Sequence, residues 1–281
     1  MKNKTLNLTL KLTRNIAYAA TLALFAAGAS ANDRLFTYSY EPETMPQGAF
    51  EVEQWVTWRA LRNSRVGQDN YHRFQFRTEL EYGVTDRYTV GLYVNEQYER
   101  FRDPGTRRSM DEFCWKGISL ENRYMVLNPA TSPVGLTLYL EPTYDGIDFE
   151  LEQKIILGQR HGDWKWAVNL IHATEWEDHF EETEGEVEFT AGLTRMIGKH
   201  WALGVEARNH NELPEYREWE NSALYVGPVV SYRRENWWAT LTVMPQVWGD
   251  NFHGPDPDGN RGLELEGHER WNARLIFGFS F

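Results

Sequence analysis

The sequence has 281 residues, a formal net charge of −12 and a negative mean hydropathy, yet it contains 12 Trp, 14 Tyr and 14 Phe. So acidic a chain is a poor ligand for nucleic acid, and its sole cysteine, Cys114, excludes an internal disulfide. Abundant aromatic residues with little net hydropathy suit a β-barrel that is polar inside and apolar outside.

The first 31 residues predict a secretory signal peptide. Four basic residues precede a short apolar run at 16–27, and an Ala-Ser-Ala sequence follows, ending at Ala31, near which cleavage is expected. The apolar run is too short to span a bilayer, and no later stretch offers about 18 apolar residues in a row. Cleavage would remove four positive charges and no negative ones, which takes the formal net charge from −12 to −16.

Residues 32–49 form an N-terminal segment before the first predicted strand. Phe36, Tyr38 and Tyr40 alternate here, ahead of two prolines. The segment either lies in the periplasm or folds into the lumen as a plug or gate. The periplasmic placement is expected, since chain termini are usually loose unless they are tied down.

Residues 50–281 predict an all-β, antiparallel, up-and-down transmembrane barrel of about twelve strands, with ten to fourteen as the bounds. In the clearest strand, 72–82, apolar side chains such as Phe74 and Phe76 alternate with polar ones. Strands of about ten residues have the length that a tilted strand needs to cross a membrane. The other eleven segments are 50–59, 88–98, 113–125, 135–144, 149–158, 164–175, 186–195, 201–210, 222–233, 237–248 and 271–281.

The links between these segments alternate in length. Short links such as 83–86 and 196–199 alternate with long polar links such as 99–112 and 249–270. This alternation predicts short periplasmic turns, long acidic extracellular loops and two periplasmic termini. Two links depart from the pattern, which leaves one or two strand boundaries open: the link 126–134 is long for a turn, and 145–148 is short for a loop.

The last strand, Trp271 to Phe281, places six apolar side chains on one face and ends on an aromatic residue. It resembles the C-terminal strand of bacterial outer-membrane β-barrel proteins, which the barrel-assembly machinery recognises. The resemblance implies a location in the outer membrane of a Gram-negative bacterium, with membrane lipid and that machinery as partners. The stretch 41–53 is similar to uncharacterised barrel families, from which no functional residue carries over.

Charged side chains fall mainly on the inward face of the predicted strands. They could form an ion-pair lattice that fills the barrel, or they could line a water-filled pore. Eight-stranded barrels are filled by side chains, whereas barrels of 16 to 18 strands leave an aqueous channel. Twelve strands lie between these sizes, so barrel size does not decide between a filled lumen and a pore. The lumen-lining candidates are Glu51, Glu53, Arg73, Arg77, Glu79, Glu81, Glu121, Arg123, Glu150, Glu152, Lys165, Glu186, Glu188, Glu206, Arg208 and Arg274.

Four of these acids are predicted to gather near the periplasmic end. If the first hairpin pairs through the link 60–70, Glu51 and Glu53 lie beside Glu79 and Glu81. Directly opposed like charges destabilise a sheet, so Arg274, a bound cation or altered protonation should compensate them. The cluster predicts a mild preference for cations.

No catalytic group is predicted. His72, His172 and Ser222 lie near external strand ends but not on adjacent strands, and the acids around Asp178-His179 are typical of a solvated loop. No metal or cofactor is predicted either. The stretch 256–260 begins like a calcium loop, but glycine occupies the position of the closing acid, and the histidines have no paired spacing. Six tryptophans near strand ends predict aromatic girdles: Trp58, Trp164, Trp201, Trp237, Trp238 and Trp271.

The sequence therefore predicts passive passage of small solutes or ions, with a mild cation preference. A closed structural or surface-interaction barrel and a membrane-embedded hydrolase are the alternatives. A soluble periplasmic β protein would instead need the face of Phe74, Phe76 and Leu80 covered by a second sheet. The sequence does not indicate the substrate or the oligomeric state.

Overall fold

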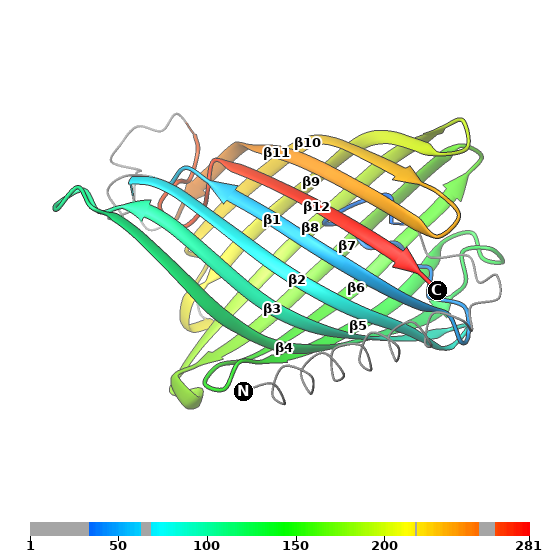
Figure 1. Cartoon of the computed structure of the whole chain (residues 1–281), viewed down its shortest axis with the longest axis horizontal. Helices are drawn as coiled ribbons and strands as arrows, with labels where there is room; N and C mark the ends of the chain where they lie inside the picture. The colour runs from blue at the N-terminus through cyan, green and yellow to red at the C-terminus, as the bar shows by residue number, and fades with distance from the viewer. Residues whose placement is uncertain (1–33, 63–68, 217, 253–261) are drawn as a thin grey trace, which may run out of the picture.

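The computed structural model describes residues 34–62, 69–216, 218–252 and 262–281, which form one closed antiparallel β-barrel (Figure 1). Each strand pairs with its sequence neighbours, and β1 pairs with β12 to close the ring. The predicted fold class and strand number are confirmed. The strands are β1 (Phe50–Ala60), β2 (Asp69–Thr85), β3 (Tyr88–Arg102), β4 (Ser109–Leu127), β5 (Gly135–Tyr144), β6 (Phe149–His161), β7 (Trp164–Glu177), β8 (Glu182–Ile197), β9 (Trp201–Leu213), β10 (Asn221–Arg233), β11 (Trp237–Asn251) and β12 (Trp271–Ser280).

Several strands are longer than the alternation of residues predicted. β4 begins at Ser109 instead of 113, and most of its residues from Ser109 to Lys116 are exposed. The β3–β4 hairpin extends past its neighbours in Figure 1. Alternation of apolar and polar residues requires one buried face, so it fades where water reaches both sides of a hairpin.

The links alternate between the two ends of the barrel. We call the end with the shorter links and Phe281 the turn end, and the opposite end the loop end (Figure 1). Gly162 and Gly198 have left-handed φ values of 58° and 67° in two of the tight turns, a conformation that glycine adopts without strain. The two irregular links, at 128–134 and 145–148, fit this alternation, so no strand boundary is misplaced there. Two single 3-10 turns, η2 (Asp178–Phe180) and η3 (Pro214–Tyr216), lie at the loop end.

The outer surface of the barrel is an exposed apolar band. No second sheet covers it in the described part of the chain, and Leu80 is 42% exposed. Such a band is typical of a barrel that contacts lipid. Within the described ranges, no helix is both long and apolar enough to cross a membrane. Other exposed members of the band are Leu92, Leu120, Leu138, Ile155, Val168, Leu170, Phe189, Leu203, Leu241, Leu275 and Phe277.

One tryptophan departs from the predicted girdles. Trp164 and Trp201 are about half exposed on the outer face, as expected. Trp238, however, is fully buried inside the barrel, so its assignment to a girdle is wrong. Successive side chains of a strand point to opposite faces, and Trp237 and Trp238 therefore cannot both face lipid.

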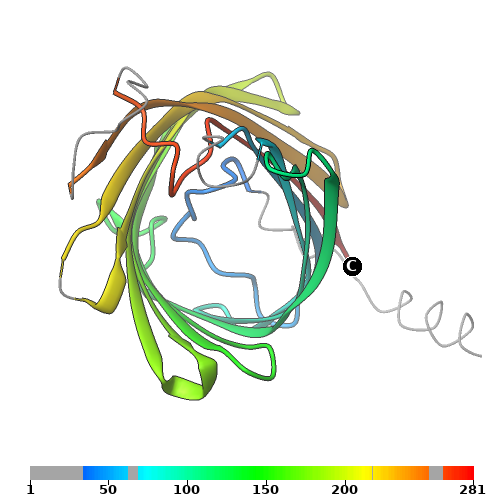
Figure 2. The same ribbon diagram turned by 90° about the vertical axis from the view of Figure 1, so that its left-hand side faces the viewer.

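Residues 34–49 run through the interior of the barrel before β1 begins, and we call them the plug segment (Figure 2). Most of its side chains are buried, and Phe36 is 0% exposed. Its last residues join the turn end, where the Gly48 N–H donates to the carbonyl of Gly83 over 2.8 Å. Of the two placements considered for this segment, the structure has the one inside the lumen.

Candidate functional site

The sixteen lumen-lining candidates lie on strands and are buried or half-buried, but the structure divides them into two sets of eight. One set lines a cavity of about 500 Å³: Arg73, Arg77, Glu150, Glu152, Glu186, Glu188, Arg208 and Arg274. The other set lies outside the lining of this cavity: Glu51, Glu53, Glu79, Glu81, Glu121, Arg123, Lys165 and Glu206. The lumen therefore consists of an open compartment and a packed one.

The cavity is bounded by the loop end on one side and by the plug segment on the other. Asp145, Pro214 and Glu220 line it at the loop end, whereas Tyr38 and Tyr40 of the plug segment line its deeper part. Its volume is within the range of small-molecule pockets. A small solute that enters from the loop end thus meets the plug segment before it reaches the turn end.

The charges around the cavity are unevenly distributed. Thirteen carboxylates and seven Lys or Arg side chains line it. Glu150, Glu175 and Glu186 are among seven acids on β6, β7 and β8, whereas Arg73 and Arg274 are among four arginines on β1, β2 and β12. In a ring of twelve strands these two groups are on opposite sides, so the cavity has an acidic wall that faces a basic wall.

Ion pairs hold several of the basic side chains in place. Arg77 on β2 pairs across the lumen with Glu141 on β5, and Arg208 on β9 pairs with Glu188 on β8 at 2.5 Å. Arg274 does not contact the four clustered acids, so the compensation that the sequence suggested from it is wrong. Arg274 instead donates to the carbonyl of Thr37 over 3.1 Å, in the plug segment.

The carboxylate of Glu206 on β9 holds the middle of the plug segment. It accepts hydrogen bonds from three successive backbone N–H groups, those of Thr37 at 3.2 Å, Tyr38 at 2.8 Å and Ser39 at 2.6 Å. The hydroxyl groups of Thr37 and Thr242 also donate to it. One buried acid therefore satisfies backbone donors that no strand partner reaches.

Other polar side chains of the wall bind the backbone of the plug segment. The Asn169 amide bonds both backbone groups of Tyr40: its oxygen accepts from the N–H at 2.6 Å, and its nitrogen donates to the carbonyl at 3.0 Å. Ser231 and Thr240 donate to the carbonyl of Arg34. These bonds satisfy the polar groups of an irregular segment that is away from water.

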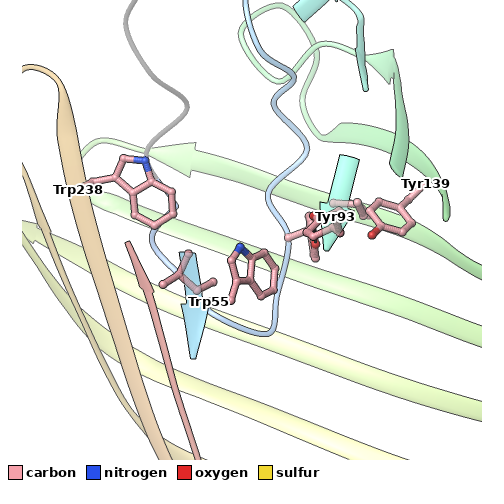
Figure 3. Packing of buried hydrophobic residues seen from close by; sticks show 7 residues of the cluster. Trp55, Tyr93, Tyr139 and Trp238 are labelled. Atoms are coloured by element: carbon pink, nitrogen blue, oxygen red, sulfur yellow. Dashed lines mark hydrogen bonds between the residues drawn. The ribbon is translucent and has the colours of Figure 1, made fainter. Parts of the chain in front are cut away.

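A layer of aromatic side chains packs around the plug segment. Figure 3 shows Trp55, Tyr93 and Tyr139 inside the barrel. These side chains come from β1, β3 and β5. The ring of Tyr40 lies 5.2 Å from that of Tyr139, and the guanidinium of Arg34 lies 4.0 Å from the ring centroid of Tyr40. The plug segment therefore contributes a cation, the guanidinium of Arg34, that packs against an aromatic ring.

The four clustered acids lie where the first hairpin was predicted to place them. Glu51 pairs with Glu81 and Glu53 with Glu79 in the register of β1 and β2. Arg123 forms ion pairs with Glu81 and also with Glu121, a fifth buried acid. All five acids are at most 3% exposed, so they belong to the packed compartment and not to the cavity.

Burial shifts the pKa of Glu41 and of His268, which both lie outside the strands. It raises the pKa of Glu41 in the plug segment to about 7, and one oxygen of this carboxyl group accepts from the N–H of Leu35 at 2.8 Å. Burial also lowers the pKa of His268, in the segment before β12, well below its usual value. The plug segment therefore has a titrating group near neutral pH.

The residues weighed for catalysis are separated from one another. His72 accepts a hydrogen bond from Trp58, and His172 contacts the hydroxyl of Tyr216. Ser222 accepts from Asn209, so no Ser–His pair forms among these three in the described part of the chain. The stretch 256–260, considered for calcium, lies outside the described residues.

Sequence reasoning named Glu206 and Arg274 as lumen-lining candidates but did not indicate which inward-facing residues hold the plug segment. Asn169, Ser231 and Thr240 are inward-facing polar residues like many others in the alternation. Only the spacing of Phe36, Tyr38 and Tyr40 indicated that this segment has buried partners. The partners themselves lie 129 to 206 residues away along the chain.

The fold and the lumen define a class: closed twelve-stranded β-barrels with an apolar outer band and an internal plug. The chain also matches a protein family described as "Family of unknown function (DUF6662)", over residues 28–156 and 159–281. It therefore belongs to this family. No curated protein matches the chain.

Two solved structures are similar in fold. The COG4313 outer membrane channel from Pseudomonas putida F1 has a TM-score of 0.56 and 12% identity, and the match covers 88% of this chain and 100% of that one. The KdgM porin in complex with disordered oligogalacturonate has a TM-score of 0.50 and 9% identity, with 82% and 99% covered. At these identities the likeness is one of fold.

Proposed function

We propose that the protein is an outer-membrane channel for small solutes or ions, and that the plug segment closes it at the turn end. The observation that carries this proposal is the cavity of about 500 Å³, which the loop-end residues border on one side and Tyr38 and Tyr40 on the other. The apolar outer band supports a membrane location. The two similar structures described above, a channel and a porin, support the same function.

We assign the turn end to the periplasm and the loop end to the exterior. Short turns with both strand termini on one side are typical of outer-membrane barrels. Phe281 donates its N–H to the carbonyl of Phe50, so the start of β1 and the end of β12 meet at the turn end. The plug segment therefore lies at the periplasmic side of the cavity.

A closed structural or surface-interaction barrel is the second candidate. It is favoured by the many hydrogen bonds between the wall and the plug segment, including those of Glu206 and Asn169. In that case the plug segment would be a permanent part of the core. The two candidates differ in one property, namely whether ions pass once the plug segment has been removed.

Deletion of residues 34–46 is expected to convert the barrel to a steadily conducting pore. The deletion leaves the Gly48 contact with the turn end intact but removes the backbone that crosses the lumen. Refolded wild-type and deleted proteins would be compared by single-channel recording in planar bilayers, after heat-dependent gel mobility has shown that both are folded. Steady currents from the folded deletion variant support the channel. Silence from it supports the closed barrel.

The acidic lining supports a mild preference for cations in transit. We expect the selectivity to arise at the loop-end mouth of the cavity and not at the clustered acids of the packed compartment, because acids at this mouth border the cavity and the clustered acids do not. Replacing Glu177, Glu184 and Glu220 together with glutamine should move the reversal potential of the plug-deleted barrel toward anions in a salt gradient.

The shift in reversal potential caused by the triple variant should be large near 0.1 M salt and small near 1 M, since the screening length falls from about 10 Å to about 3 Å. Glu112→Gln provides the control, because Glu112 is exposed on β4 and does not line the cavity. An unchanged reversal potential for the triple variant at low salt would contradict the cation preference while leaving the channel itself untouched.

A further inference from the structure

The packed compartment contains five buried carboxylates, those of Glu51, Glu53, Glu79, Glu81 and Glu121, which we call the acidic cluster. Carboxylate oxygens of Glu79, Glu81 and Glu121 lie within 4.8 Å of one another. Within the described ranges, the two arginines that form ion pairs with the cluster are Arg34 and Arg123. When all five acids are ionised, the cluster therefore has more negative than positive charge.

Most members of the acidic cluster have protein donors. Glu51 accepts from the Trp238 indole at 3.1 Å and from Ser280, and Glu53 accepts from the Trp55 indole at 2.7 Å. These contacts occupy the part of the cluster nearest β12 and β11. None of these three hydrogen bonds involves Glu79, which lies on the other side of the cluster.

Glu79 is the exception in the acidic cluster. Its side chain is 0% exposed, and neither of its carboxylate oxygens accepts a hydrogen bond of good geometry. The hydroxyl of Tyr93 lies close to Glu79 but donates to Glu121, over 2.6 Å. A buried carboxylate is tolerated only when it is paired, protonated or bound to a metal ion. Two unpartnered oxygens aimed into a cluster of further oxygens point to a ligand.

The carboxylate of Glu79 occupies a position of the inner wall that has no side chain of its own, at Gly91. Gly91 on β3 pairs with Glu81 of β2 on one side and with Glu121 of β4 on the other. A Cβ atom at Gly91 would lie 2.5 Å from one oxygen of Glu79. Gly91 therefore lies between Glu81 and Glu121 without a side chain, and the carboxylate of Glu79 extends over it.

We propose that Glu79, Glu81 and Glu121 bind one divalent cation, Ca²⁺. The ligand atoms of this group are carboxylate oxygens, which hard cations prefer over the softer transition metals. Ca²⁺ accepts six to eight oxygens in irregular geometry, whereas Mg²⁺ requires a near-ideal octahedron and retains several waters. A cluster of buried carboxylates without octahedral order therefore favours Ca²⁺.

The cation site would lie directly against the plug segment. The hydroxyl of Tyr40 is 3.5 Å from Glu121, and Arg34 is 3.8 Å from Glu53. A bound ion would neutralise part of the acidic cluster next to these two contacts. Occupancy of the site should therefore stabilise the folded barrel, because the ion binds the folded state and not the unfolded chain.

Terbium luminescence tests this proposal without measuring transport. Tb³⁺ replaces Ca²⁺ at oxygen sites, and Tyr93 and Trp55, which donate to carboxylates of the cluster, would sensitise its emission. Folded, chelator-treated protein would be titrated with Tb³⁺ and then with Ca²⁺ or Mg²⁺. We expect saturable emission that Ca²⁺ displaces at much lower concentration than Mg²⁺.

Two variants and one control decide the assignment. Glu79→Gln should weaken Tb³⁺ binding at least tenfold, and Gly91→Ala, which keeps all five acids but would displace the carboxylate of Glu79, should weaken it in the same direction. Glu150→Gln removes an acid of the cavity wall instead and should leave the affinity unchanged. Equal binding by the wild type and both site variants, or the absence of Ca²⁺-displaceable emission, would overturn the proposal.

A second measurement covers the case in which a site variant does not fold. The urea midpoint of the wild-type barrel should rise when Ca²⁺ replaces chelator, whereas Mg²⁺ at the same concentration should change it little. A midpoint that does not respond to Ca²⁺ would also overturn the proposal. Neither readout depends on whether the barrel conducts.

Discussion

Replacing Glu206 with alanine is expected to release the plug segment and to raise the fraction of time in which the barrel conducts by about a hundredfold. The substitution removes the acceptor for three backbone N–H groups, those of Thr37, Tyr38 and Ser39. A buried donor without a partner costs about 1–3 kcal/mol. Even about 3 kcal/mol in total corresponds to roughly a hundredfold change in equilibrium.

Single-channel recording measures the fraction of time in which the barrel conducts. Unlike the deletion variant, Glu206→Ala keeps the plug segment in the chain. Thr242→Val is the matched control, because it removes one donor to Glu206 and leaves the contacts of the carboxylate with the plug segment in place. Its open fraction should stay near that of the wild type. A Glu206→Ala barrel that is folded and as silent as the wild type would show that Glu206 does not hold the closed state.

Arg123→Met is expected to be the most destabilising single substitution in the packed compartment. Arg123 is buried and pairs with both Glu81 and Glu121. Removing one partner of a buried ion pair typically costs about 3–5 kcal/mol, because the remaining charge is left without compensation. The urea midpoint, measured in chelator so that no metal contributes, should fall accordingly.

The triple variant Arg123→Met, Glu81→Gln, Glu121→Gln should recover much of this loss, since it removes the charges that the arginine balances. Arg102→Met is the control: its pair with Asp69 is 3.3 Å long, but both side chains are more than 40% exposed. Exposed pairs contribute about 0–1 kcal/mol, so this variant should unfold close to the wild type. If the triple variant were no more stable than Arg123→Met, repulsion in the acidic cluster would not be the cause.

The barrel itself could be predicted because its signal is local and repeated. Alternating side chains mark each strand, and link lengths mark the two ends, so twelve strands and their order follow without any long-range information. The same parity correctly placed Glu51 and Glu53 beside Glu79 and Glu81. It also shows why one of the adjacent residues Trp237 and Trp238 must face inward, which the prediction of girdles ignored.

The division of the lumen could not be predicted in this way. Glu206 and Glu186 both alternate with outward-facing residues, yet one holds the plug segment and the other lines the cavity. The difference arises from where residues 34–49 lie, and their contacts join positions more than 120 residues apart. Arg274 illustrates the same limit, since its partner is the backbone of Thr37 and not the clustered acids.

The order of the strands that hold the plug segment has a consequence for biogenesis. The backbone of residues 34–39 is bound by Glu206 of β9, Ser231 of β10, Thr240 of β11 and Arg274 of β12. These are the last four strands to be synthesised, although they bind the first part of the described chain. A barrel without these strands therefore lacks the partners of residues 34–39, and this part of the plug segment can be bound completely only after β12 has been added. Occlusion of the lumen would then mark a finished molecule, and an immature barrel would be left unsealed.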